Sequence, residues 1–286
     1  MKYSLTFLTI FIVIYSKASD TVSTKYQNLN KLYTSISVGY AGNLKNTDEY
    51  LYKTIGNSNY YEYLDKNEGK CTVIEGGLTY KLTPNLGFGA TVGYFNGANL
   101  KYNEQLYDTS NTFIKIASNQ RTQYLKISPF IIMDAPVSFN NSVYAKVSGI
   151  IGSGNTKTTF NDQFIYLNGN SDQQELTYKS TGNAITGLNV AVGFKFKIGK
   201  NQAMFIELNQ DFVSQKITNR EMIAAKYNGQ NILKNIPTYY KQTIYTNQVP
   251  QNQTIDKNQP RKSLYYRNNY SNIGIKVGLI FYLNTF

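Results

Sequence analysis

The sequence contains no histidine and no tryptophan, and Cys71 is its single cysteine. Without histidine, the chain has no imidazole to serve as a general acid or base near neutral pH, and most zinc sites are excluded as well. A single cysteine forms no disulfide within the chain and supplies no thiolate metal site. We therefore expect a protein that is not an enzyme, binds no metal and carries no cofactor.

The chain also lacks a long hydrophobic run. Its apolar stretch over residues 5–14 is shorter than the roughly 20 residues that a membrane-spanning helix needs. Lys2 precedes this stretch, and the small residues Ser16 and Ala18 follow it, an order typical of a secretory signal peptide. The sequence thus predicts a signal peptide over residues 1–18 and one exported domain over residues 19–286. An amphipathic anchor is the alternative interpretation of the N-terminus.

The main pattern of the exported part is the alternation of apolar and polar residues with period two, which is typical of β-strands. Residues 184–198 and 271–283 show it most clearly, and other segments show it with varying clarity. The predicted strands cover residues 31–41, 71–82, 86–95, 121–133, 143–151, 184–198, 203–213 and 271–283.

The connections between these strands alternate strictly between short and long. The short ones cover residues 83–85, 134–142 and 199–202, and the long ones cover residues 42–70, 96–120, 152–183 and 214–270. Membrane barrels have such short turns on one side and long loops on the other, and strands of about ten residues, tilted near 40–45°, match their apolar band. We predict an all-β fold, a closed antiparallel up-and-down transmembrane barrel of eight strands.

Alternation does not tell which face of the strands meets lipid, because a soluble barrel with an apolar interior alternates in the same way. The glycines favour an apolar exterior, since most of them share the polar face, where a narrow barrel has room for little else. Gly76 and Gly149 are exceptions. Those on the polar face are Gly39, Gly77, Gly87, Gly89, Gly93, Gly187, Gly193, Gly274 and Gly278.

Charged residues occupy the same polar face. If this face lines the lumen, the charges must be paired or hydrogen-bonded, because an isolated buried charge is costly. We expect Glu207 to contact Lys195, Lys197 or Lys276 from the flanking strands. The alternative is a set of solvated charges on a soluble sheet. The predicted lumen network comprises Glu75, Lys126, Lys146, Lys195, Lys197, Glu207, Asp211 and Lys276.

The last segment, residues 276–283, carries a polar residue, a glycine two positions later and then hydrophobic residues. It is similar to the C-terminal assembly signal of outer-membrane proteins, with Gly278, Phe281, Leu283 and the terminal Phe286 as the matching positions. Leu283 stands where that family usually has an aromatic residue. Together with the strands, this segment makes the exported chain resemble the small OmpA-type and OmpX-type barrels of the porin-like superfamily. The resemblance implies an outer-membrane location, insertion by the barrel assembly machinery and a plugged, mostly structural barrel.

The formal net charge of the chain is +12. Because the basic residues are spread along the chain and not clustered, and because an exported protein does not routinely meet nucleic acid, we do not expect nucleic-acid binding. Outer-membrane lipid and lipopolysaccharide are the expected partners. Three functions stay open: a structural or surface-exposed barrel without catalysis, an adhesin or ligand-binding protein that acts through its long loops, and a narrow pore with a preference for anions. The tyrosine-rich loops fit either solvated β-ribbons or a binding surface.

Overall fold

The computed structural model describes residues 31–43, 47–55, 58–66, 69–107, 113–138, 140–249 and 255–283. The predicted signal peptide, residues 1–18, and Phe286 lie outside the described residues. Almost every described residue lies in a strand or in a turn between strands. Within these ranges, no helix is long and apolar enough to cross a membrane.

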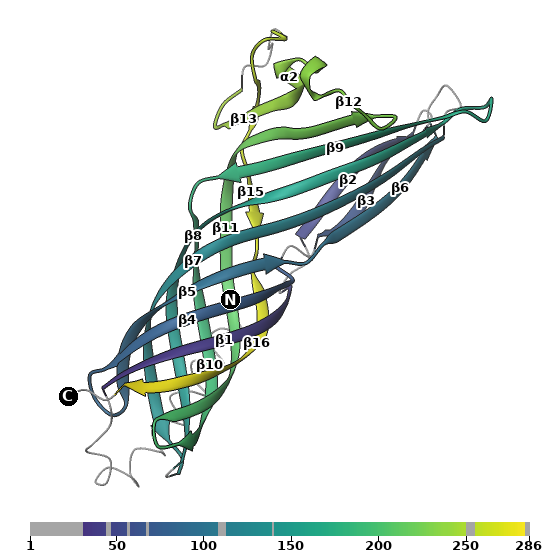
Figure 1. Cartoon of the computed structure of the whole chain (residues 1–286). Coiled ribbons are helices and arrows are strands. Elements are labelled where there is room, and N and C mark those ends of the chain that lie inside the picture. Colours follow the sequence, from purple (N-terminus) through teal and green to yellow (C-terminus); the bar gives the residue numbers. More distant parts are fainter. Residues whose placement is uncertain are drawn as a thin grey trace.

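The strands form a closed antiparallel ring in which each strand pairs with its neighbours along the chain (Figure 1). The first strand, β1, pairs with both β4 and the last strand, β16, and the pairing of β10 with β11 completes the ring. The ring consists of β1 (Leu32–Asn43), β4 (Cys71–Lys81), β5 (Leu86–Gly97), β7 (Phe113–Pro136), β8 (Asn141–Ile165), β10 (Ile185–Gly199), β11 (Gln202–Tyr227) and β16 (Asn272–Leu283). The predicted eight-stranded up-and-down barrel is confirmed.

Three strands run far beyond their predicted ends: β7, β8 and β11 have 24, 25 and 26 residues. Their upper halves lack a regular alternation of apolar and polar residues and were expected to be long connections. They remain strands because their backbone groups pair with further strands above the barrel. These are β6 (Leu100–Tyr107), which pairs with β7, and β9 (Ser171–Gly182), which lies between β8 and β11. We call this upper part of the wall, with β6, β7, β8, β9 and β11, the sheet extension (Figure 1).

The remaining elements belong to the long connections. β2 (Thr47–Ile55) and β3 (Ser58–Lys66) pair with each other in a separate sheet. An Asn-Gly turn, with positive φ at Asn228 and Gly229, joins β11 to the short β12 (Gln230–Asn231), as expected of a tight hairpin. The last connection contains η1 (Leu233–Asn235), α2 (Thr238–Lys241), β13 (Gln242–Thr246), β14 (Arg261–Leu264) and β15 (Tyr266–Asn269). Two parts of the long connections are β-ribbon: β8 continues as far as Ile165, and residues 242–246 form β13.

The two faces of the barrel wall differ as the glycines predicted. On β1, Ile36 and Val38 are 54% and 58% exposed, whereas Ser37 between them is 9% exposed. The same alternation runs along β16, where outward-facing apolar residues flank the buried Lys276. Such a continuous apolar exterior is far larger than the apolar patches of soluble proteins and matches the lipid-facing band of a membrane barrel. The interpretation as a soluble barrel is thereby excluded, and the chain is an integral membrane β-barrel.

One detail of the predicted strands needs correction, and one residue within them is unusual. The turn expected over residues 134–142 is shorter, because β7 continues to Pro136 and places Asp134 inside the barrel. Pro129 lies in the middle of β7, where it pairs with Ala90 of β5. A proline has no backbone N–H to donate, and the register between β7 and β8 accordingly lacks a pair at this point.

Candidate functional site in the barrel lumen

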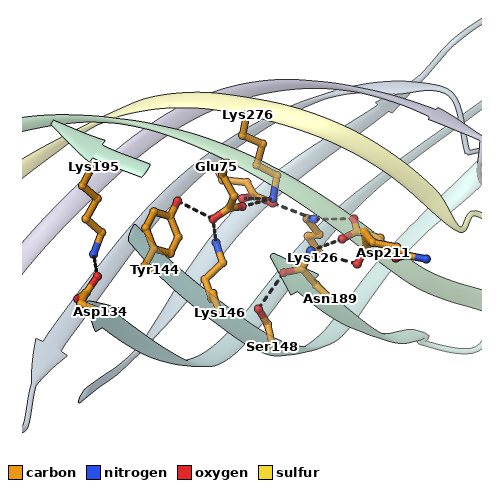
Figure 2. A network of polar contacts seen from close by, with 12 residues as sticks. Glu75, Lys126, Asp134, Tyr144, Lys146, Ser148, Asn189, Lys195, Asp211 and Lys276 are labelled. Carbon is orange, nitrogen blue, oxygen red and sulfur yellow. Dashed lines mark hydrogen bonds and ion pairs between the residues drawn. The ribbon is translucent and has the colours of Figure 1, made fainter. Parts of the chain in front are cut away.

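The charged side chains of the polar face converge in the lumen (Figure 2). Strand alternation directs every second residue inward, so charged residues of several strands meet in the lumen. Glu75 on β4, Lys126 on β7, and Glu207 and Asp211 on β11 are all nearly inaccessible to solvent, as is Lys276 on β16. The structure therefore brings together residues that lie far apart in the sequence.

Glu75 lies at the centre of this cluster. Its Oε1 is 2.8 Å from Nζ of Lys126, and its Oε2 is 2.9 Å from Nζ of Lys276. Glu75 and Lys126 are not on neighbouring strands, because β5 lies between them with Gly93 in the same row. A Cβ atom on Gly93 would lie 2.8 Å from Cγ of Glu75 and 3.3 Å from Cε of Lys126. The ion pair thus occupies the space that the missing side chain leaves.

Glu207 holds the second half of the cluster. Its Oε2 accepts a hydrogen bond of 2.6 Å from Lys146 and one of 3.0 Å from the hydroxyl of Tyr144. Its Oε1 is 3.5 Å from Nζ of Lys276, so Lys276 connects both glutamates. The room for the Tyr144 ring comes from Gly193, where a Cβ would lie 2.4 Å from the ring.

Asp211 extends the cluster toward the end of the barrel that bears the long loops. Its Oδ2 is 3.4 Å from Nζ of Lys126, and its Oδ1 accepts a hydrogen bond of 2.5 Å from the side-chain amide of Asn189. Ser148 in turn donates to Asn189 over 3.2 Å. Every carboxylate of the cluster therefore has a cationic partner, which offsets the cost of burial.

A separate ion-pair cluster lies toward the end of the barrel with the short turns. Asp134 pairs with Lys195 at 2.6 Å and also with Lys81. Nζ of Lys195 also lies over the rings of Tyr144 and Tyr33, 4.7 Å and 5.4 Å from their centroids. Lys195 was one of three expected partners of Glu207, but it contacts Asp134 instead. Of the three, Lys276 is the one that lies near Glu207.

Lys197 differs from the other predicted lumen residues, since its side chain is exposed near the end of β10. The pairing of β10 with β11 shifts register between Lys197 and Gly199, so the regular inward phase ends there. Sequence reasoning also missed Asp134, which was assigned to a turn. The available signal was its phase, because positions 126, 128, 130, 132 and 134 of β7 all lie on the inward face.

Apolar layers fill the lumen on both sides of the charges. Toward the long loops, Phe95 stacks on Tyr124 with ring centroids 4.2 Å apart, and both rings contact Tyr270. This upper layer comprises Ala41, Cys71, Val73, Phe95, Tyr124, Ile150, Ile185, Val213 and Tyr270. The lower layer, toward the short turns, comprises Tyr33, Phe130, Ile132, Tyr144, Ala203, Phe205 and Ile280.

These layers determine what the lumen can do. An ion or polar solute entering from either end meets packed aromatic and aliphatic side chains before it reaches the charged cluster, and crossing such a layer without water is costly. The charged groups between the layers are paired with one another. The arrangement is that of a filled barrel interior.

The C-terminal strand carries the residues of the predicted assembly signal. Gly278 faces inward, where a Cβ would lie 2.4 Å from the backbone oxygen of Ile36 and 2.5 Å from the ring of Phe205. Phe281 and Leu283 face outward with 38% and 39% exposure. Cys71, the free cysteine, is buried in the upper layer.

No protein-family model matches the chain, and no curated protein matches it. Among solved structures, it is similar to Ail, the attachment invasion locus protein of Yersinia pestis, which was crystallised in complex with the heparin analogue sucrose octasulfate. The identity is 12% and the TM-score is 0.28, and the match covers 88% of this chain and 98% of that chain. It is also similar to the outer membrane protease OmpT from Escherichia coli, with 14% identity and a TM-score of 0.30 over 92% and 99%. A third is the toluene transporter TodX of P. putida, with 10% identity and a TM-score of 0.29 over 91% and 92%.

At these TM-scores, the architecture rests on the strand pairing of the chain itself. That pairing, together with the apolar exterior, defines an eight-stranded β-barrel of the bacterial outer-membrane class. A barrel fold of this kind does not by itself assign an activity, because one fold can carry many different functions.

Proposed function

We propose that the protein is a non-conducting, non-catalytic barrel of the outer membrane that holds the sheet extension at the cell surface. The observation that supports this most directly is the lumen, which is filled by an ion-paired cluster between two apolar layers. The sheet extension continues the strands of the wall without a break, so it is mechanically coupled to the membrane part. The barrel then acts as an anchor and the extension as the exposed part.

Conductance in planar lipid bilayers tests the anchor role against the narrow pore. The purified protein should give no stable current steps. A double variant, Phe95→Ala with Tyr124→Ala, removes the stacked rings of the upper layer and serves as a comparison that opens one end. Stable anion-selective steps from the unaltered protein would overturn the proposal, because they require a continuous wet path past Lys126, Lys146 and Lys276.

Insertion by the barrel assembly machinery is part of the same proposal. The inward Gly278 and the outward Phe281 and Leu283 of β16 support this part of the proposal. We expect Phe281→Asn to reduce the amount of folded protein in the outer membrane. Thr186→Asn, an exposed change on β10, is the control and should leave that amount unchanged.

A second function, binding of an extracellular ligand, is favoured by a recess of about 670 Å³ on the sheet extension. Most of its lining residues are polar, next to the apolar Ile116 and Ala117, and they include both members of the Lys226–Glu175 ion pair, which are 3.1 Å apart. Adhesion of cells that carry Gln163→Ala, Gln173→Ala and Lys226→Ala tests this function. A loss of adhesion relative to Lys200→Ala, in a short turn, supports ligand binding, and unchanged adhesion removes it.

A further inference from the structure

Three cations form one cross-strand row on the outer face of the barrel wall. Arg121 of β7 is the register partner of Lys157 of β8, and Lys157 is the register partner of Lys179 of β9. Register partners on adjacent strands project from the same face, and neighbouring strands are about 4.8 Å apart. The three cationic groups therefore lie within about 10 Å of one another along the row.

The row is exposed and holds an excess of positive charge. All three side chains are solvent-accessible, and Lys157 and Lys179 form no ion pair within the described residues. Arg121 donates to the side-chain oxygen of Asn96, a neutral acceptor, over 3.1 Å and 2.5 Å. The next register position after Lys179 is Glu221, so a single carboxylate stands at one end of the row.

Like charges directly opposite each other destabilise a sheet. Binding of an anionic group to the row would relieve this repulsion.

The row also has a defined height relative to the membrane. On the same face of β7, Leu125 is 61% exposed and faces lipid, and its sequence position is four residues from Arg121. At about 3.3 Å per residue and a tilt near 40°, the row lies about 10 Å beyond Leu125. Ile151 of β8, 60% exposed, marks the apolar band below Lys157 in the same way. The next outward-facing residue above Leu125 is the polar Gln123, so the apolar band ends between the two and the row lies about 5–10 Å beyond it. Lipid headgroups extend about 5–8 Å beyond the hydrocarbon, so the row overlaps the headgroup layer.

We propose that Arg121, Lys157 and Lys179 bind the phosphate groups of an anionic lipid of the outer leaflet. Phosphate fits the site because guanidinium and ammonium groups form charge-assisted hydrogen bonds with phosphate oxygens. The source is a lipid because the row faces away from the lumen, directly above lipid-facing side chains, so a bound headgroup keeps its acyl chains against the apolar band. The inference depends on the membrane embedding of the barrel and is independent of its display role.

The test is native mass spectrometry of the protein released from nanodiscs, with bis-phosphorylated lipid A and dephosphorylated lipid A offered in turn. The test variant is R121Q/K157Q/K179Q. The control variant K101Q/K234Q/K262Q removes the same charge from exposed positions elsewhere. We expect the unaltered protein and the control to retain the phosphorylated lipid, with retention at least tenfold lower in the test variant.

Several outcomes overturn the proposal. Equal retention of dephosphorylated lipid A would show that phosphate is not recognised. An equal loss in the control would show a general charge effect. Competition by inorganic phosphate alone, at the same affinity as the lipid, would show a site for the free anion. Both variants should still migrate as folded barrels without boiling, and a test variant that fails this check is replaced by K157Q alone, for which at least a threefold loss is expected.

Discussion

Glu75 and Lys126 form an ion pair of 2.8 Å across Gly93, which belongs to the strand between theirs. The relationship joins β4 to β7 without the help of any side chain on β5. It shows how a narrow barrel accommodates charged side chains in its lumen. A glycine in one strand lets long side chains from the two flanking strands meet. The same device recurs where Gly193 leaves room for Tyr144 beside Glu207.

Removal of the Glu75 carboxylate should destabilise the barrel strongly. Glu75→Gln leaves Lys126 and Lys276 with one counter-charge fewer in a buried site, and breaking a buried pair costs about 3–5 kcal/mol. Urea unfolding in lipid vesicles measures the change. Glu175→Gln is the control, because its pair with Lys226 is exposed and is expected to contribute about 1 kcal/mol or less. Equal effects of the two changes would contradict the buried network.

A methyl group at Gly93 should disturb the same site from the other side. Gly93→Ala places a Cβ 2.8 Å from Cγ of Glu75, so the ion pair must shift, at a cost of about 1–3 kcal/mol. Gly149→Ala is the matched control, because nothing lies within 4 Å of a Cβ there. The unfolding free energies of both variants check the prediction, which fails if the Gly149 variant loses as much stability.

A charge on the lipid-facing side should cost more than one on the lumen side at a similar depth. Val192 faces outward on β10, and Val192→Lys should destabilise the folded barrel by about 2–4 kcal/mol. Thr91→Lys adds the same charge on the inward face and should disturb packing more than insertion. Equilibrium unfolding in vesicles ranks the two, and the reverse order would contradict the assignment of the faces.

The tip of the sheet extension should respond to acid. Asp172 accepts hydrogen bonds from the hydroxyls of Tyr227 at 2.5 Å and Tyr166 at 2.8 Å, and from the amide of Asn228 at 2.8 Å. The hydrogen bond from Tyr227 lowers the pKa of Asp172, and the carboxylate raises the pKa of Tyr227 to about 12. Because the pKa of Asp172 is lowered on folding, its stabilisation is present above about pH 3.9 and is lost as pH falls through the lowered value.

Hydrogen exchange of the backbone amide of Gln173, which donates to Asn228, reports on this cluster. Relative to the intrinsic exchange rate at the same pH, we expect this amide to be less protected in strong acid, and in Asp172→Asn already at pH 7. Tyr227 has the opposite pH dependence, because its pKa is raised on folding. The stabilisation from its hydrogen bond to Asp172 is lost as pH rises through the pKa of Tyr227, about 12. Asp162→Asn, on the adjoining strand, is the control and should leave the exchange of Gln173 unchanged. Protection that is independent of pH would contradict the role of Asp172.

The barrel itself could be predicted from local patterns. Alternation along residues 184–198 and 271–283 marks strands because consecutive side chains point to opposite faces, and β10 and β16 lie where that pattern placed them. The glycines indicated which face turns inward, since a closed ring of eight strands leaves little space inside. The absence of histidine excluded imidazole chemistry whatever the fold.

The partners of the charges and the length of the wall were decided by the tertiary structure. Lys195 pairs with Asp134, and Glu207 with Lys146, because strand tilt and register bring together residues of distant strands that no sequence interval relates. The upper halves of β7, β8 and β11 do not repeat the regular apolar–polar alternation that marks the lower halves as strands. They are strands because neighbouring strands satisfy their backbone hydrogen bonds, and only the tertiary structure shows which strands those are.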